Sequence, residues 1–373
     1  MIDLNSYLRA RFGTKVYKLA LDGGMTCPNR DGTCGTRGCI FCSEGGSGDF
    51  AEPAAVRVSG QAEGSFCAGA PSLGVARRIA AAKERLRVKL GRQFDSTKFI
   101  AYFQSYTNTY APVEYLRKLF GEAIEDDSVA VLSVATRPDC LPEEVVGLLT
   151  EINRIKPVWV ELGLQTVHED SARFIRRGYE LGVFEDAVAR LTAAGIEVIV
   201  HVILGLPGES PEDMLETVRY VAGLAGAGVS RQARCVQAEA RAGLAAPGQG
   251  VCEEPVSYVG IRGIKLQLLH IMRGTDLAEL FDAASEVIRL PDGTVLPLAI
   301  RTAEEYLRVL EDALTIIGDS LVIHRLTGDA PHDKLVFPMW SANKRLVLNE
   351  ITNRMKTSDK LIRVICTKNK LSS

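Results

Sequence analysis

The sequence lacks the features that mark a membrane protein or a secreted one. It has no apolar run of roughly 18 residues, the length that spans a bilayer. Its first residues, MIDLNSYLRARFGTKVYKLAL, have no apolar core between a basic start and a small-residue cleavage site. We therefore predict neither a membrane span nor a signal peptide, and we expect a cytoplasmic, reducing compartment. There, clustered cysteines are more often metal ligands or catalytic groups than disulfides.

An excess of one charge is also missing. The chain has 44 Lys and Arg against 46 Asp and Glu, and its isoelectric point is near 6.3. The chain therefore has no overall positive charge that would indicate binding to nucleic acid. The local exception is residues 344–373, which hold eight basic residues against two acidic ones. A length of 373 residues suffices for one large barrel or two modest domains.

Short β-branched runs alternate with helical stretches along most of the chain. Continuous apolar strands between helices predict a parallel sheet covered on both faces. Polar residues follow several of these strands, where α/β barrels place their active-site loops, so we favour an α/β fold with a partial (β/α)6 TIM-like barrel over an open doubly wound sheet. The predicted strands are 15–21, 97–104, 128–136, 157–166, 196–206 and 264–271, and the predicted helices are 74–90, 112–124, 142–153, 184–195 and 210–224.

The alternation of strands and helices is interrupted at 44–73 and 225–262, and it changes after residue 275. We predict a core domain at 14–275 and a small α/β extension with a basic tail at 276–373, in which 303–317 reads as a helix and 320–329 as a strand and turn. Within the core, residues 225–262 have no clear period and few large apolar side chains. Because this segment joins a helix to the following strand, we predict a surface insertion on the barrel face opposite the active-site loops.

Four of the nine cysteines, Cys27, Cys34, Cys39 and Cys42, lie within one Gly-rich loop. Three thiolates leave a four-iron cluster one ligand short, so that the open iron can bind a substrate or cofactor. Cys34, Cys39 and Cys42 give the spacing C-x4-C-x2-C, whereas Cys27 in place of Cys34 gives C-x11-C-x2-C, and the residues alone leave both open. A zinc ion held by all four is the rival. The loop has only one C-x2-C pair, which favours iron–sulfur.

The motifs CPNRDGT…GCIFC, YFQSYTNT, ATRPDCLP, ELGLQT, GLPGES, IKLQLLH and PMW occur in this order. In this respect the chain resembles the YhcC/YtqA-type radical S-adenosylmethionine (SAM) proteins, relatives of the radical SAM half of the Elongator catalytic subunit. The resemblance covers nearly the whole chain. It implies a [4Fe-4S] cluster on Cys27, Cys39 and Cys42, with Cys34 a bystander, and reductive cleavage of SAM to a 5′-deoxyadenosyl radical.

The resemblance also implies where SAM binds. Phe41, between the last two cluster cysteines, stands where the superfamily holds the adenine. Gln104, Ser105 and Tyr106 end the second strand. Other members carry a Gly-Gly-Glu motif there for the methionyl amine, and this chain has polar side chains in its place.

Four further SAM contacts are predicted at the ends of the third and fourth strands. Thr136 and Arg137 end the third strand, and the planar fork of Arg137 suits the SAM carboxylate. Glu161 and Gln165 belong to the fourth strand, where they are expected to contact the ribose or the amino-acid moiety.

Two glycines and two histidines complete the candidates. In GLPGES, Gly205 and Gly208 are interpreted as letting the backbone approach the adenine. His201 is interpreted as a satisfied core residue, and His270 as a weak substrate candidate at the barrel mouth.

The resemblance implies action on the modified wobble uridine of transfer RNA, with an electron donor such as flavodoxin or ferredoxin. The basic C-terminal stretch supports RNA contact, because phosphates are bound by Lys and Arg. The slightly acidic isoelectric point fits poorly with a large RNA footprint. Two alternatives stay open: radical chemistry on a small molecule or a protein, and a zinc-stabilised RNA-binding adaptor without catalysis.

Overall fold

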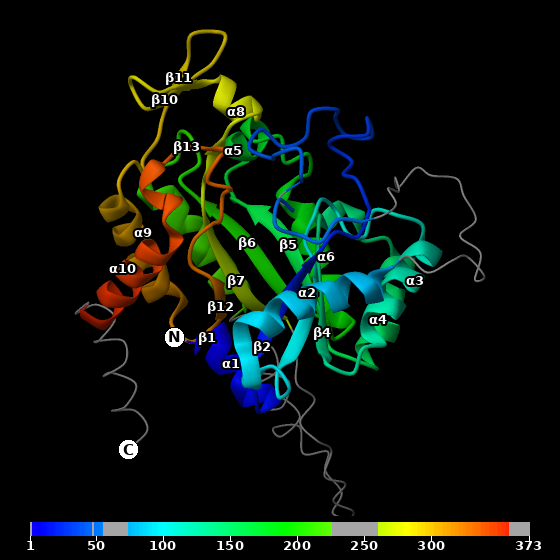
Figure 1. Ribbon diagram of the computed structural model, residues 1–373. Helices are drawn as coiled ribbons and strands as arrows, with labels where there is room; N and C mark the ends of the chain where they lie inside the picture. Colours follow the sequence, from blue (N-terminus) through cyan, green and yellow to red (C-terminus); the bar gives the residue numbers. More distant parts are fainter. Residues whose placement is uncertain (1, 47, 55–73, 226–259, 358–373) are drawn as a thin grey trace, which may run out of the picture.

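The computed structural model describes residues 2–46, 48–54, 74–225 and 260–357 (Figure 1). Most of the predicted insertion at 225–262 and the end of the predicted basic tail lie outside these residues. The same holds for Cys67, Cys235, Cys252 and Cys366.

The main sheet has eight strands, and all neighbouring pairs in it are parallel. It curls into a half-barrel, which confirms the predicted fold class (Figure 1). The strands follow one another across the sheet in the order β1 (Ile2–Asp3), β12 (Val322–Arg325), β7 (Ile261–Leu268), β6 (Glu197–Leu204), β5 (Val158–Gln165), β4 (Val129–Thr136), β3 (Lys98–Phe103) and β2 (Val16–Leu21).

Amphipathic helices cover the outer face of the half-barrel. In α3 (Val113–Ile124), Leu116, Phe120 and Ala123 recur at helical spacing and are fully buried. The ring of Phe120 meets that of Phe103 on β3 edge-on, with 5.3 Å between centroids. The other covering helices are α2 (Val75–Leu90), α4 (Glu143–Asn153), α6 (Leu181–Ala193), a helical stretch at 211–225 and α9 (Ala303–Ile317).

A short helix closes the narrow end of the half-barrel. Helix α1 (Leu4–Phe12) runs from β1 at one edge of the sheet to β2 at the other. Its first turn is capped by the carboxylate of Asp3, and it ends at Gly13, whose φ of 69° favours glycine. Leu8 is buried in a cluster with Trp159 and other inward-facing strand residues. The helix therefore forms the floor of the barrel interior.

Two strands of the sheet lie outside the predicted core range of 14–275. Strand β12 belongs to the C-terminal extension and pairs with β7, with Ile323 opposite Ile264. It covers the backbone groups that an edge strand would leave unpaired. Strand β1, which precedes the range, pairs with β12 in turn.

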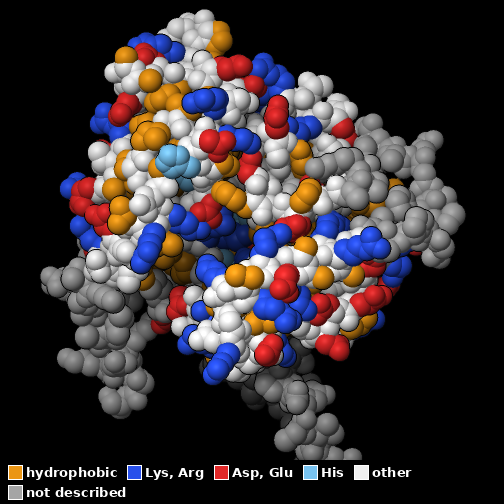
Figure 2. All heavy atoms as spheres, viewed as in Figure 1, with side chains coloured by type: hydrophobic (Ala, Val, Ile, Leu, Met, Phe, Trp, Pro, Cys, Tyr) orange, Lys and Arg blue, Asp and Glu red, His pale blue; other side chains and the backbone are white. Residues whose placement is uncertain are grey.

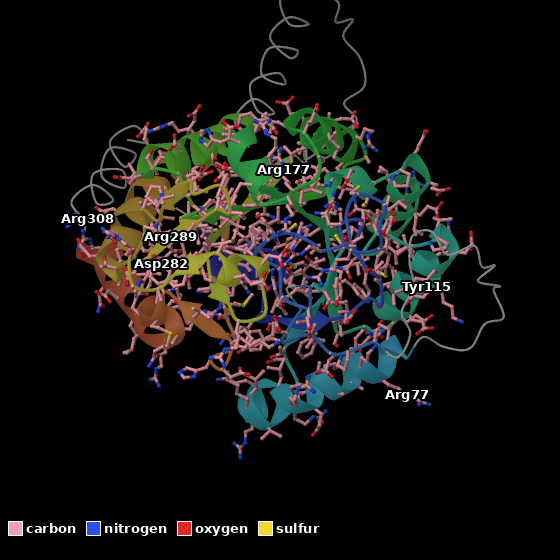
Figure 3. The ribbon with its side chains drawn as sticks, turned by 90° about the horizontal axis from the view of Figure 1, so that it is seen from above. Arg77, Tyr115, Arg177, Asp282, Arg289 and Arg308 are labelled. Atoms are coloured by element: carbon pink, nitrogen blue, oxygen red, sulfur yellow. The ribbon has the colours of Figure 1, made fainter. Side chains whose placement is uncertain are left out.

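Two small antiparallel sheets and several further helices complete the described residues. One sheet joins β9 (Phe281–Asp282), β10 (Val287–Arg289) and β11 (Val295–Pro297), and Asp282 pairs with Arg289 (Figure 3). The other joins β8 (Ile271–Met272) and β13 (Leu335–Phe337). The remaining helices are α5 (Glu169–Phe174), α8 (Asp276–Glu279), α10 (Lys344–Thr357) and the 3-10 turns Gly91–Gln93, Pro138–Cys140 and Met339–Ala342.

Among the helices of the described residues, none has both the length and the apolar character that crossing a bilayer requires.

Candidate active site

A cavity of about 580 Å³ lies inside the half-barrel and extends to the carboxyl ends of its strands. Its size suits a cofactor or a small substrate. Figure 2 shows Lys and Arg side chains gathered in the hollow at the centre of one face. Ten of the thirteen predicted site residues line this cavity: Cys27, Cys39, Phe41, Cys42, Gln104, Tyr106, Thr136, Arg137, Glu161 and Gln165.

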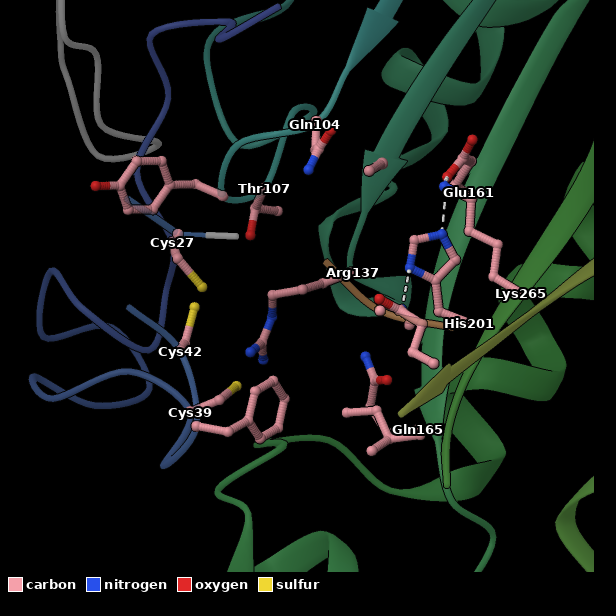
Figure 4. Close-up of a pocket in the computed structure, with 18 of the residues that line it drawn as sticks. Cys27, Cys39, Cys42, Gln104, Thr107, Arg137, Glu161, Gln165, His201 and Lys265 are labelled. Atoms are coloured by element: carbon pink, nitrogen blue, oxygen red, sulfur yellow. Dashed lines mark hydrogen bonds and ion pairs between the residues drawn. The ribbon is translucent and has the colours of Figure 1, made fainter. Parts of the chain in front are cut away.

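Three cysteines converge at one end of the cavity (Figure 4). Tight turns shape the loop: the N–H of Cys42 donates to the carbonyl of Cys39 at 3.0 Å. The side chain of Asn29 donates to the carbonyl of Arg176 at 2.7 Å and lies 3.4 Å from the sulfur of Cys39. Cys34, by contrast, is exposed and is not among the lining residues.

The electrostatics of the three thiols fit a bound metal group. Burial, and then the proximity of Cys42 and Cys27, raises the pKa of Cys39 to about 12. Three thiolates this close repel one another, and a cation bound between them reverses that repulsion. The donor set therefore fits an iron–sulfur cluster held by three thiolates.

Two polar residues at strand ends have a backbone conformation that non-glycine residues rarely adopt. Tyr106 has a φ of 58° and Gln165 a φ of 68°. Such strain collects at functional sites, where the surrounding structure holds it. The side-chain oxygen of Gln165 is buried and has no hydrogen-bond partner among the described residues. It lines the cavity, so it is an acceptor available to a ligand.

Packing between the cluster loop and Tyr106 supplies a testable requirement. A Cβ at Gly46 would overlap the Tyr106 ring, whereas no heavy atom lies within 4 Å of a Cβ at Gly32. Both glycines have positive φ, at 58° and 94°, so alanine is strained at each. We expect Gly46→Ala to lower the iron retained after anaerobic reconstitution severalfold and Gly32→Ala to retain most of it. Equal retention by the two variants would show that this contact does not shape the loop.

The fork of Arg137 is engaged within the protein. Its Nε and Nη2 donate to the two carboxylate oxygens of Asp139 at 2.9 and 2.6 Å, and its Nη1 donates to the carbonyl of Arg177 at 3.0 Å. The predicted two-pronged contact with the SAM carboxylate therefore competes with Asp139. The hydroxyl of Thr136 is likewise shared with Thr109 at 2.5 Å. Arg177 is itself buried, whereas Arg77 and Arg308 point outward in the view from above (Figure 3).

Glu161 lines the cavity as part of a buried polar network. Its Oε1 accepts from Lys18 at 3.2 Å and from Ser133 at 2.8 Å. Its Oε2 accepts from His201 at 2.8 Å and also from Lys265 (Figure 4). A carboxylate has about four acceptor positions, so these four donors saturate it. The network thus gives Glu161 a different environment from the expected ribose contact, and it gives His201 a polar partner at the cavity wall.

Sequence reasoning missed the cations of this network. Lys18 and Lys265 stand inside the apolar strands VYKLAL and IRGIKLQL. A lysine is almost never fully buried unless it is paired. A lysine within an otherwise apolar strand could therefore have indicated that a buried partner lies nearby.

Three predicted residues do not line the cavity. Ser105 is buried behind it, next to Gly48. Gly205 and Gly208 have φ of 94° and 85°, and their nearest neighbours are Ile300 and Leu296 of the extension. Their left-handed conformation explains the glycines without a ligand.

Comparison with known proteins agrees with this geometry. The chain is 36% identical over 353 residues to the uncharacterized protein YtqA of Bacillus subtilis, covering 95% of this chain and 88% of that protein. It is 31% identical over 339 residues to protein YhcC of Escherichia coli, covering 90% and 86%. The predicted resemblance to YhcC/YtqA-type proteins is confirmed.

A likeness in fold extends to a solved structure, that of Elp3 from Methanocaldococcus infernus. The TM-score is 0.53 at 17% sequence identity, and the alignment covers 91% of this chain and 63% of that one.

Two family descriptions match successive parts of the chain. The Radical SAM superfamily matches residues 32–221, and the Radical_SAM C-terminal domain matches residues 261–357. The first match includes Cys39 and Cys42, and the second includes Lys265 and Arg325. The chain therefore belongs to the radical SAM superfamily, whose cofactors are, as predicted, a [4Fe-4S] cluster and SAM.

Proposed function

We propose that this protein is a radical SAM enzyme whose cluster is held by Cys27, Cys39 and Cys42. The observation that carries the proposal is the convergence of these three thiols at one end of the cavity, with Cys34 exposed outside it. Three ligands leave one iron open for SAM. Four-thiol zinc binding would require Cys34 to join the other three, which the fold of the loop opposes.

The residues of the chain position SAM and shield it. When bound, the cluster and SAM supply a 5′-deoxyadenosyl radical that abstracts a hydrogen atom from the substrate. We assign the buried acceptor of Gln165 to an N–H group of SAM and the ring of Phe41 to its adenine. Gln104 and Tyr106 complete the polar wall at the end of β3. The floor formed by α1 keeps bulk water from the inner end of the cavity.

We further propose that the substrate is transfer RNA at the wobble uridine. The support is a shorter similarity: 31% identity over 90 residues to a tRNA uridine(34) acetyltransferase of Dehalococcoides mccartyi, covering 24% of this chain and 19% of that protein. The resemblance in motif order to the YhcC/YtqA-type proteins, relatives of the Elongator catalytic subunit, points the same way. We place the enzyme in the cytoplasm, with flavodoxin or ferredoxin as the electron donor.

A single assay tests the reaction and the substrate. Anaerobically reconstituted protein with reduced flavodoxin and SAM should release 5′-deoxyadenosine. Transfer RNA from a strain that lacks the gene should raise that rate at least severalfold, and transfer RNA from the parent strain should not, because its sites are already modified. Mass spectrometry of the nucleosides should show the new group at uridine 34.

The outcomes separate the proposals. Release of 5′-deoxyadenosine with no response to either transfer RNA would remove the RNA assignment and leave the radical SAM reaction. A colourless protein that contains zinc after the same reconstitution would instead favour the RNA-binding adaptor.

A further inference from the structure

Basic side chains outnumber carboxylates at the inner end of the cavity, where Glu161 and Asp329 are the acidic lining residues. Three cations reach it from three strands: Lys18 from β2, Lys265 from β7 and Arg325 from β12. We call these three residues the inner cation cluster. Glu161 is the carboxylate that contacts its two lysines, and it is completely buried. Glu161 is thus the shared partner of two lysine side chains, and burial lowers the pKa of Lys265 well below its usual value.

The other nearby groups do not balance the surplus. Arg325 lies 3.5 Å from Asp329, a long contact, and Asp329 also pairs with Lys344. His201 adds no positive charge at neutral pH, because burial, and then the charge of Lys265, lowers its pKa to about 4. The hydroxyl of Tyr102 lies 3.0 Å from the Nζ of Lys265 and is uncharged.

Part of the cluster is accessible to a ligand. The side chain of Lys18 is 24% exposed, whereas that of Lys265 is 3% exposed. Both line the cavity. Lysine has three N–H donors, so Lys18 can hold Glu161 and still donate to an incoming group. Glu161 itself is saturated and offers a ligand no further acceptor.

The inner cation cluster lies across the cavity from the cysteines. In Figure 4, Lys265, Glu161 and His201 stand on the side opposite Cys27, Cys39 and Cys42, with Arg137 and Gln165 between them. SAM would be held at the cysteine end of the cavity under the proposed function, so its carboxylate would lie away from the inner cation cluster.

We propose that Lys18, Lys265 and Arg325 bind an anionic oxygen group of the substrate, a carboxylate or a phosphate, at the inner end of the cavity. Its position beside SAM rests on the proposed function. The three basic side chains share two carboxylates, Glu161 and Asp329, and an anion would give them a further partner. Two sources share this chemistry: a small carboxylate-bearing co-substrate and the phosphate of a nucleotide.

Equilibrium binding tests this proposal without turnover. Reconstituted protein saturated with SAM, with no reductant, is titrated calorimetrically with malonate, inorganic phosphate and malonamide. We expect one site per chain for malonate or phosphate and no binding of the neutral malonamide. Lys18→Met should weaken binding about tenfold or more, and Lys18→Arg should restore most of it. Lys15→Met is the matched control, because Lys15 is exposed and lies outside the cavity.

Each outcome has one meaning. Binding of malonate alone assigns a carboxylate, and binding of phosphate alone assigns a phosphate. Binding of neither anion, or equal binding by wild type and Lys18→Met, overturns the proposal. A protein that binds an anion but releases no 5′-deoxyadenosine upholds this site and removes the proposed reaction. A protein that cleaves SAM but binds neither anion upholds the proposed reaction and removes this site.

Discussion

Replacing Cys39 or Cys42 with alanine is expected to remove the iron–sulfur cluster altogether. Each variant leaves two thiols where a four-iron cluster with one open iron needs three. The iron content after anaerobic reconstitution should fall from about four per chain to well below one, and the brown charge-transfer absorbance should vanish. Cys27→Ala should behave in the same way. Iron and sulfide analysis of each purified variant measures the effect.

Cys34→Ala is the matched control, because it removes a thiol from the same loop. Cys34 is exposed and is not among the residues that line the cavity, so its loss should leave the iron content unchanged. If Cys34→Ala lost the cluster and Cys27→Ala retained it, the ligand assignment would be wrong, and C-x4-C-x2-C would be the binding motif.

Glu161→Gln is expected to destabilise the folded protein strongly. The amide leaves Lys18 and Lys265 without their shared counter-charge in a buried position. Breaking a buried ion pair in this way costs about 3–5 kcal/mol in the free energy of unfolding. Urea titration followed by the fluorescence of tryptophan measures it, since Trp159 is fully buried. Glu151→Gln is the control: Glu151 pairs with Arg117 on the surface, and its loss should be close to neutral.

The carboxylate of Glu161 also makes the difference in stability between wild type and Glu161→Gln depend on pH. Burial raises the pKa of Glu161, but the charges of Lys18 and Lys265 and the hydrogen bond from His201 outweigh burial and hold it well below its usual value. A carboxyl group with a lowered pKa in the folded state stabilises the protein above its unfolded pKa, about 4.3. That contribution is lost as the pH falls through the folded pKa. The advantage of wild type over Glu161→Gln should therefore shrink below about pH 4.3. An advantage that grew there would contradict the assigned pairing.

The sequence predicted the repeating part of the fold well. Strands such as β4 and β5 are long, apolar and flanked by amphipathic helices, so periodicity identifies them. Strand β12 has four residues, and β1 has two. Elements this short carry almost no periodicity, and their place in the sheet depends on an edge that only the folded chain presents. The barrel sheet was therefore predicted with six of its eight strands, and the strand expected at 320–329, which contains β12, was assigned to the extension.

Most of the residues predicted at strand ends line the cavity, whereas two lysines within strands were missed. Gln104, Thr136 and Gln165 end their strands, and all three line the cavity. Lys18 and Lys265 lie within strands, and nothing local in the sequence shows that their side chains meet at Glu161. Gly205 and Gly208 were predicted as site residues but do not line the cavity. A glycine can be required either by a positive φ or by the close approach of a ligand, and the sequence does not distinguish the two.

The pairing of Ile2 with Val322 has a consequence for synthesis on the ribosome. The partner of β1 emerges more than three hundred residues after β1 itself. At about 5–20 residues per second, this wait is roughly 15–60 s. The cysteines of the cluster loop are made near the start of that interval, whereas Arg325 completes the inner cation cluster near its end. Chains that stall or are cut before β12 therefore leave the ribosome with their cluster thiols present and one wall of the cavity missing.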